Sequence, residues 1–165
     1  MTMSMVLIGF AALAMSACSR GDGAMRSPSY IAPFGAPVGQ RKGTYKLGAP
    51  YVINGVRYVP RHDPHYDQVG LASWYGGGFH GKQTANGEIF DARRISGAHQ
   101  TLPLPSLVRV TNLQNGRSIV VRINDRGPFV AGRIIDLSQQ AAGRLGYVGK
   151  GVTRVRVQYL GPAKL

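Results

Sequence analysis

Alternating hydrophobic and polar positions mark three segments in the second half of the chain, residues 107–112, 117–124 and 152–159. This period of two is typical of strands that bury one face. Asn115 and Gly116 lie between the first two segments, and an Asn-Gly pair favours a hairpin turn. The pattern therefore predicts a β-hairpin and, later in the chain, a further strand.

Two other patterns add a second hairpin and a helix. Asn54 and Gly55 interrupt the apolar-rich residues 51–59, which predicts a short hairpin with a type I′ turn. Only residues 138–145 have a helical composition, and Gly146 follows them as an end signal. Several short strands with one or two short helices predict a mainly β protein that folds as a small barrel.

The first 17 residues predict a lipoprotein signal peptide. Residues 5–17 form an apolar run of the length of a signal-peptide core, too short to span a bilayer comfortably. Residues 15–18 resemble the lipobox of bacterial lipoproteins, whose cysteine is released by cleavage and diacylated. Cys18, the single cysteine of the chain, is therefore the expected lipidation site, with a buried free thiol as the alternative. One cysteine also excludes an internal disulfide.

The residue after this cysteine and the segments that follow give an expected location and domain organisation. Ser19 stands where an aspartate commonly retains lipoproteins at the inner membrane, so we expect a lipid-anchored outer-membrane protein that faces the periplasm. The rest of the chain divides into a flexible tether rich in Gly, Pro, Ser and Ala (18–44), a hairpin extension (45–69) and a barrel domain (70–162).

The charge balance is strongly basic. Across 165 residues, 20 Lys and Arg stand against 7 Asp and Glu, which gives a net charge of +13. A basic protein raises nucleic acid as a partner, but an exported chain without a recognition helix, zinc finger or stacking platform is not expected to bind it. Acidic envelope polymers and anionic lipids remain as partners, with a merely solubilising positive surface as the alternative.

Four segments with glycine or proline turns display residues suited to glycosidic bond cleavage, namely residues 72–76, 84–88, 98–103 and 124–129. They hold the carboxylates Glu88 and Asp125, the imidazole of His99, and the aromatic side chains Trp74 and Tyr75. Cleavage needs a carboxylic acid to protonate the leaving oxygen and usually a second group for the oxocarbenium-like centre, and sugar rings stack on aromatic side chains. These segments therefore predict a glycan site.

Each of these residues also has a structural interpretation. Asp125 with Arg126 fits a salt-bridged turn, Trp74 fits a core side chain, and His99 fits a hydrogen-bonded structural residue. Carboxylates in a cationic field have lowered pKa values, so a working acid has to be partly desolvated. Pro64 interrupts the one cluster of histidines and aspartates, so no metal or cofactor is expected.

Motifs in order along the chain resemble the rare lipoprotein A family, and they are residues 70–76, 79–88, 98–105, 108–113, 124–129 and 133–138. The resemblance implies a six-stranded double-psi β-barrel related to expansins and barwin-like endoglucanases. It also implies lytic transglycosylase activity on peptidoglycan strands that lack stem peptides. Such enzymes use the C6 hydroxyl of the muramic acid itself and leave a 1,6-anhydro end, so they require neither a protein nucleophile nor a metal.

The resemblance also implies roles for individual residues. Asp125 is expected to be the general acid and base, Glu88 the second carboxylate, and His99 a residue that orients a carboxylate or binds sugar. The expected substrate-binding residues are Trp74, Tyr75, Asn86 and Arg126. For the muramic lactyl carboxylates, the expected cation near the groove is Lys82, Arg126 or Arg133.

Two functions from other classes stay open at the level of sequence. One is a non-catalytic, expansin-like peptidoglycan-binding lipoprotein that uses the same groove without cleaving. The other is a structural envelope lipoprotein whose barrel serves protein contacts. The presence of both Glu88 and Asp125 favours the enzyme, and division or envelope proteins are further partners that the sequence does not identify.

Overall fold

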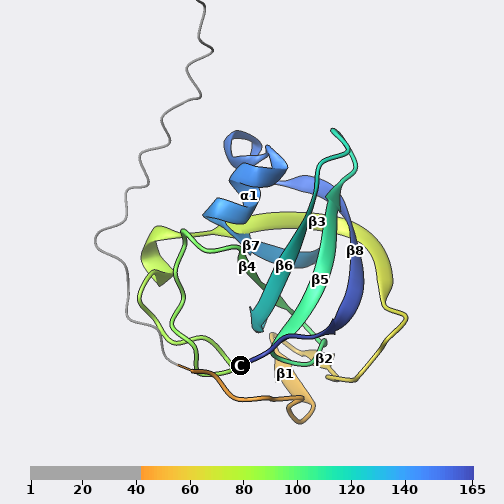
Figure 1. The fold of residues 1–165 in the computed structure, drawn as a ribbon. Coiled ribbons are helices and arrows are strands. Elements are labelled where there is room, and N and C mark those ends of the chain that lie inside the picture. The colour runs from red at the N-terminus through yellow and green to blue at the C-terminus, as the bar shows by residue number, and fades with distance from the viewer. Residues whose placement is uncertain (1–41) are drawn as a thin grey trace, which may run out of the picture. The chain divides into compact units, whose positions relative to one another are not determined.

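Six strands close into a barrel in the computed structural model, which describes residues 42–165 (Figure 1). The strands are β3 (Asp67–Tyr75), β4 (Ser96–His99), β5 (Ser106–Asn112), β6 (Ser118–Asp125), β7 (Arg133–Ser138) and β8 (Thr153–Pro162), and around the barrel they follow the order β3-β7-β4-β6-β5-β8. The pairs β3–β7 and β4–β6 are parallel, and the other four pairs are antiparallel. The predicted signal peptide, Cys18 and nearly all of the predicted tether lie outside the described residues.

The segments predicted from periodicity are confirmed as elements. The alternating segments are β5, β6 and β8, and the early hairpin is β1 (Tyr51–Ile53) paired with β2 (Val56–Tyr58). The helix is α1 (Gln139–Leu145), and two short 3-10 helices, η1 (Gly77–Phe79) and η2 (Val148–Lys150), complete the list. The first barrel strand begins at Asp67, inside the segment predicted as the hairpin extension. Among residues 42–165, no helix has both the length and the apolar character needed to cross a membrane.

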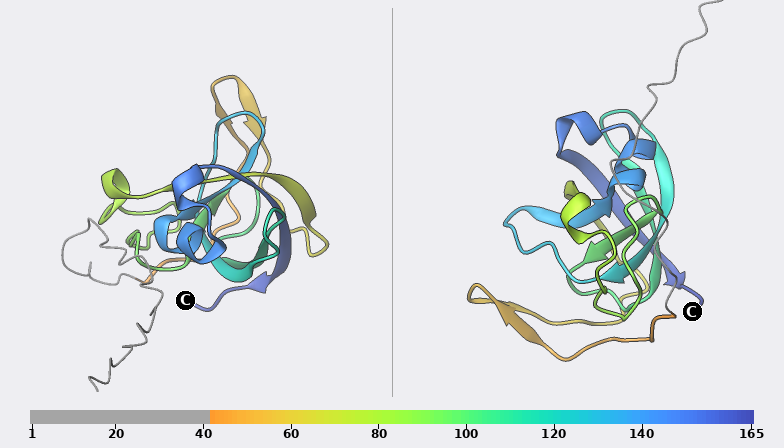
Figure 2. Two further views of the ribbon diagram at one scale, coloured as in Figure 1. Left: turned by 90° about the horizontal axis from the view of Figure 1, so that it is seen from above. Right: turned by 90° about the vertical axis from the view of Figure 1, so that its left-hand side faces the viewer.

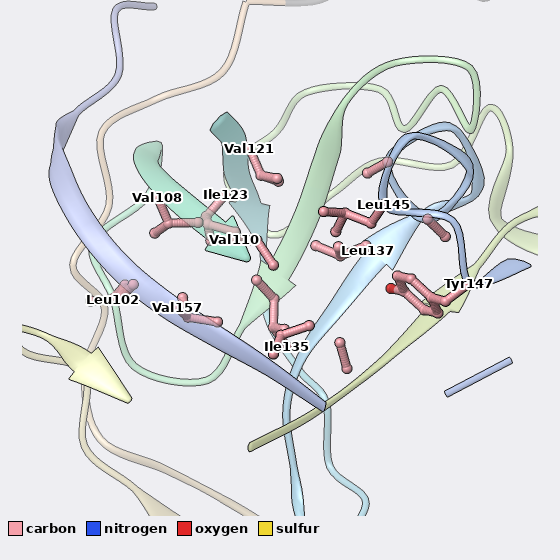
Figure 3. Close-up of a cluster of buried hydrophobic side chains, with 14 of the residues drawn as sticks. Leu102, Val108, Val110, Val121, Ile123, Ile135, Leu137, Leu145, Tyr147 and Val157 are labelled. Carbon is pink, nitrogen blue, oxygen red and sulfur yellow. The ribbon is translucent and has the colours of Figure 1, made fainter. Parts of the chain in front are cut away.

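The hydrophobic core fills the inside of the barrel (Figure 3). In β5, Val108 and Val110 are fully buried and alternate with the exposed Arg109, as the period of two requires. Burying each such side chain contributes about 1.5–3 kcal/mol. Figure 3 shows Leu145 of α1 and Tyr147 beside the strand residues, so the helix adds its apolar face to the same core.

Both ends of α1 follow from its sequence. The Ser138 hydroxyl accepts a hydrogen bond from the backbone N–H of Ala141 at 3.2 Å, which caps the first turn. Gly146 ends the helix at φ 78°, a left-handed conformation that glycine adopts without strain. Viewed from above, α1 lies over one end of the barrel (Figure 2).

The β1–β2 hairpin projects from the barrel beside the loop that joins β6 to β7 (Figure 2). The rings of Tyr51 and Tyr58 stack with centroids 5.2 Å apart, and both meet the ring of Phe129 edge-on. The Tyr51 hydroxyl donates to the carbonyl oxygen of Gln100 at 2.7 Å. The hairpin therefore packs against the loop that follows Asp125.

A close approach at Gly97 gives a test of the barrel. A Cβ at Gly97 would lie 2.8 Å from the carbonyl oxygen of Asp136 and 2.9 Å from Cδ2 of Leu137. Because a backbone oxygen cannot move without separating β4 from β7, we expect Gly97→Ala to lower the free energy of unfolding by about 1–3 kcal/mol. Urea denaturation followed by Trp74 fluorescence measures this. Gly149→Ala, whose Cβ would meet no atom within 4 Å, is the control, and equal midpoints for the two variants would contradict the expected clash.

Candidate active site

The strand register aligns four residues across β6, β4, β7 and β3, and they are Asp125, Ala98, Asp136 and Ser73. Paired residues on neighbouring strands point to the same face of a sheet. Asp136 lies between the core residues Ile135 and Leu137, so this face is the outer face of the barrel wall. We call these four residues the outer row. Since adjacent strands lie about 4.8 Å apart, the backbones of the two aspartates are about 10 Å apart.

Asp125 ends β6, and its carboxylate is fixed by backbone donors. Its Oδ1 accepts from the N–H of Ala85 at 2.9 Å and from the N–H of Arg126 at 2.8 Å. Burial raises the pKa of Asp125 above its ordinary value, although these two hydrogen bonds and the positive charge of Arg126 act in the opposite direction. The site thus holds a partly desolvated carboxyl group, which is the property that a general acid requires.

Glu88 is the most heavily hydrogen-bonded carboxylate of the site. Arg122 donates to it from Nε and Nη2, with Nη2 2.6 Å from Oε1. Asn86 donates to Oε1 at 2.8 Å and Asn124 donates to Oε2 at 2.9 Å. Burial acts to raise the pKa of Glu88, but the hydrogen bonds from these three residues and the charge of Arg122 outweigh it and leave the pKa below the ordinary value. Glu88 is therefore ionised at neutral pH and neutralised by its partner.

Glu88 also closes a tight turn that contacts Asp125 through the N–H of Ala85. The N–H of Thr84 donates to the carbonyl oxygen of Glu88 at 2.8 Å, and the N–H of Gly87 donates to that of Thr84 at 3.0 Å. Asn86, predicted as a substrate contact, is 2% exposed, and its Oδ1 accepts from the Thr84 hydroxyl at 2.8 Å. Asn86 therefore shapes this turn, which we call the acidic turn (residues 83–88), and the acidic turn presents the Ala85 N–H to Asp125.

His99 points into the barrel, away from the outer row. Its side chain is next to Ala98 in sequence and so lies on the opposite face of β4, where it is 2% exposed. Nδ1 accepts from the N–H groups of Thr101 and Leu102, both at 3.1 Å, so the proton sits on Nε2, which donates to the hydroxyl oxygen of Tyr66 at 2.9 Å. Burial, with the positive charge of Arg126, lowers the pKa of His99 to about 3. This geometry matches the interpretation of His99 as a hydrogen-bonded structural residue.

The buried His99 predicts a specific pH dependence of stability. Its folded pKa of about 3 lies below the ordinary value near 6.5, so the unfolded chain binds the extra proton. Unfolding free energy should therefore fall as pH drops from about 6.5 towards 3, with a slope of up to about 1.4 kcal/mol per pH unit. In His99→Gln this part of the slope should disappear, whereas the exposed His65→Gln should keep it. Parallel curves of urea midpoint against pH for wild type and His99→Gln would contradict the assignment.

Trp74 and Tyr75 lie on opposite faces of β3 and do not form one aromatic platform. Trp74 packs against the core, and its Nε1 donates to the carbonyl oxygen of Val148 at 3.2 Å. Tyr75 stacks on Phe90, with ring centroids 4.5 Å apart. Only Tyr75 is on the face of the outer row.

The Tyr75 hydroxyl is buried near both aspartates of the row. Burial, followed by the negative charges of Asp125 and Asp136, raises the pKa of Tyr75. Within residues 42–165 this hydroxyl has no hydrogen-bond partner. Tyr75, which was predicted to bind sugar, therefore lies at the site. Its side chain is covered by the segment that contains Phe90.

The three cations predicted near the groove have different surroundings. Arg126 donates to the carbonyl oxygens of Leu102 at 2.6 Å and Leu47 at 2.7 Å, so it holds backbone segments together. The ammonium group of Lys82 lies 5.4 Å from the centre of the Phe79 ring. Arg133, by contrast, contacts the outer row itself.

Sequence reasoning missed the carboxylate of Asp136. Its Oδ1 accepts from the Ser73 hydroxyl at 2.7 Å, and its Oδ2 lies 3.3 Å from Nη2 of Arg133. Arg133 also donates to the Ser73 hydroxyl at 2.9 Å, so each of Ser73, Arg133 and Asp136 contacts the other two. The sequence signal that could have identified Asp136 is a carboxylate within the otherwise apolar residues 134–137. In the part of the chain that the structure describes, no group of three His, Cys, Asp or Glu side chains is arranged to hold a metal ion.

Fold and site together define a double-psi β-barrel with a partly buried acid on its outer wall. The profile of the lytic transglycolase family matches residues 67–157. The chain therefore belongs to this family, and the resemblance to rare lipoprotein A proteins is confirmed.

Relatives named endolytic peptidoglycan transglycosylase RlpA include proteins of Rickettsia felis, Pseudomonas aeruginosa and Neisseria meningitidis. The Rickettsia felis protein is 50% identical over 122 residues, which cover 72% of this chain and 54% of that protein. The Pseudomonas aeruginosa protein (strain PAO1) is 54% identical over 116 residues, or 70% of this chain and 34% of that protein. The Neisseria meningitidis protein (strain MC58) is 49% identical over 115 residues, or 69% and 48%. The chain thus spans between a third and about half of the length of these relatives.

Solved structures with similar folds include the Streptomyces papain inhibitor and a Clavibacter michiganensis expansin. The inhibitor has a TM-score of 0.49 and 23% identity, and the match covers 61% of this chain and 99% of that one. The expansin has a TM-score of 0.46 and 19% identity, with coverage of 60% and 53%.

Proposed function

We propose that this chain is an endolytic peptidoglycan transglycosylase that acts on glycan strands, preferentially those without stem peptides, and leaves 1,6-anhydromuramic ends. The observation that carries the proposal is the partly buried carboxyl of Asp125, whose pKa is raised by burial. Identity of 49–54% to relatives with this named activity supports it. A raised pKa favours the protonated carboxyl, which suits proton donation to a glycosidic oxygen.

In the proposed reaction, Asp125 serves in turn as acid and as base. It donates its proton to the oxygen between C1 of the muramic acid and C4 of the next sugar while the C1–O bond breaks. The C6 hydroxyl of the same muramic acid forms the new bond to C1 and gives its proton to the Asp125 carboxylate. The acid is thereby restored, and no water is consumed.

The other carboxylates take supporting roles in this proposal. Asp136, on the same face as Asp125, supplies negative charge near the positive C1 centre, and Ser73 and Arg133 hold it in place. Both oxygens of Glu88 accept hydrogen bonds from neighbouring side chains. Glu88 is therefore a positioning residue, which acts on Asp125 through the acidic turn.

Anchoring is the other part of the proposal. We propose that the chain is lipidated at Cys18 and held at the periplasmic face of the outer membrane. The lipobox-like sequence and the serine at position 19 support this. Metabolic labelling with a fatty-acid analogue should mark the chain in cells and leave Cys18→Ser unlabelled, and equal labelling of both would overturn it.

The activity is tested by digestion of amidase-treated peptidoglycan. The full chain should generate anhydromuramic ends, detected by mass spectrometry of the released fragments. If none form under conditions where a known transglycosylase works, while the chain still sediments with the glycan, a binding function without cleavage replaces the proposal.

A further inference from the structure

A pocket of about 430 Å³ opens beside the acidic turn. One wall is residues 83–87 of that turn, and the other is a segment before the first strand, residues 42–50, which we call the strap. The strap contributes Lys42, Thr44 and Lys46 to the lining. A volume of this size falls within the range of small-molecule sites and has room for a sugar ring with its substituents.

The pocket adjoins the proposed acid through one residue. Ala85 lines the pocket, and its N–H donates to Oδ1 of Asp125 at 2.9 Å. The carbonyl oxygen of the same residue accepts from Nζ of Lys46 at 3.3 Å. A glycan chain placed with its scissile bond at Asp125 therefore has a neighbouring part within reach of this lysine.

The charge of the lining favours an anion. Its charged side chains are Lys42 and Lys46, and among the described residues that line the pocket none is acidic. The nearest carboxylate along the chain, Glu88, is engaged by Arg122. Lysine ammonium groups bind carboxylates as mobile point charges, so the pocket suits a carboxylate borne on a larger neutral molecule.

The strap holds these lysines on a fixed backbone. The N–H of Thr44 donates to the carbonyl oxygen of Asn86 at 2.8 Å, and Lys46 and Leu104 exchange two backbone hydrogen bonds of 2.7 and 2.9 Å. A Cβ at Gly43 would lie 2.5 Å from Nδ2 of Asn86, so the strap passes directly over the acidic turn. The pocket is a built feature of the fold.

We infer that this pocket binds the free lactyl carboxylate of a muramic acid residue and so selects glycan strands from which the stem peptide has been removed. The inference rests on the proposed function and names the residues, Lys42 and Lys46, that would give it its substrate preference. A stem peptide is joined to that carboxylate by an amide bond, which removes the charge and adds bulk. Both changes weaken the fit to the pocket.

The test compares two forms of the same strands. Stem-free glycan strands carry free carboxylates, and carbodiimide coupling to methylamine converts them to neutral amides. Binding is measured by co-sedimentation with the full chain carrying Asp125→Asn, so that the strands stay uncut. We expect free-carboxylate strands to bind about tenfold more tightly than amidated ones, a ratio that corresponds to about 1.4 kcal/mol, and the ratio should shrink with added salt.

Lysine variants assign the ratio to the pocket. Adding Lys42→Gln and Lys46→Gln should bring the ratio close to one and leave binding of amidated strands unchanged. The matched control, Arg144→Gln with Lys150→Gln, removes two exposed charges at the end of the barrel that α1 covers and should keep the ratio. Because Lys42 and Lys46 are exposed, the variants should melt at the wild-type temperature.

The outcomes separate this inference from the proposed activity. An unchanged ratio in the lysine variant, or a chain that binds both strand forms equally or neither, overturns the inference. Anhydromuramic ends formed by the wild-type chain would still uphold the activity in that case. A lysine-dependent ratio without such ends would uphold the carboxylate pocket and reject the enzyme.

Discussion

Asp125→Asn is expected to abolish the formation of anhydromuramic ends and to leave the fold intact. The amide oxygen of asparagine can accept the same hydrogen bonds from Ala85 and Arg126 that Oδ1 of Asp125 accepts. What the variant lacks is a transferable proton at this position. Because a general acid contributes about 10²–10⁴-fold to rate, turnover should fall at least about 100-fold. Mass spectrometry of digested strands measures the loss.

The control for Asp125→Asn is a second aspartate outside the site. Asp67 is an exposed residue whose carboxylate pairs with Arg156 on the surface, and exposed pairs of this kind contribute little to stability because water and salt screen them. Asp67→Asn should therefore digest glycan at the wild-type rate. Wild-type turnover in Asp125→Asn would reject the assignment of the acid.

Glu88→Gln is expected to reduce turnover strongly and also to destabilise the fold. A glutamine cannot match the charge-assisted bonds to Arg122, whose side chain is only 27% exposed, and loss of such a bond costs about 1–3 kcal/mol. The acidic turn then loosens, and the Ala85 N–H no longer fixes Asp125. Steady-state digestion and urea denaturation measure the two effects.

The pH dependence of this destabilisation has a defined sign. The pKa of Glu88 is lower in the folded chain than in the unfolded one, so the carboxylate stabilises the fold above its ordinary pKa of about 4.3. That stabilisation is lost as pH falls through the lowered value. The difference in unfolding free energy between wild type and Glu88→Gln should therefore close under acidic conditions.

Arg122→Gln separates a positioning role of Glu88 from a chemical one. If Glu88 acts by holding the acidic turn, Arg122→Gln should lose turnover to a similar extent, and the double variant should lose little more than either single variant. Full turnover in Arg122→Gln, combined with an inactive Glu88→Gln, would show that Glu88 takes part in the chemistry and would contradict the positioning role.

Periodicity predicted the strands that bury one face and gave little signal for those covered on both faces. Strands β5 and β8 alternate between buried and exposed residues, and both were found from the sequence. All four residues of β4 (Ser96–His99) are buried. The strand therefore has no exposed face, and its sequence shows no alternation of apolar and polar residues. No residue of β7 is exposed, and within its apolar residues 134–137 only the carboxylate of Asp136 is polar.

The motifs located the site, but its geometry depends on register. Asp125 and Glu88 were found as candidates because they lie in recognisable turn motifs. The Arg122 partner of Glu88 is 34 residues away, and only the fold brings the two together. The inward direction of His99 follows from its pairing with the core residue Ile135 of β7, a detail that composition does not carry. The lysines of the strap lie outside every motif of the sequence, and only the fold places them beside the acidic turn.

Digestion in ¹⁸O-labelled water tests the central claim, which is that Asp125 drives intramolecular transfer to the C6 hydroxyl. Stem-free glycan strands are incubated with the full chain, and the new ends are analysed by mass spectrometry. The account predicts ends that lack the label and are one water lighter than reducing ends, and it predicts their loss in Asp125→Asn. Labelled reducing ends would identify hydrolysis instead, and either these or an absence of new ends would contradict the account.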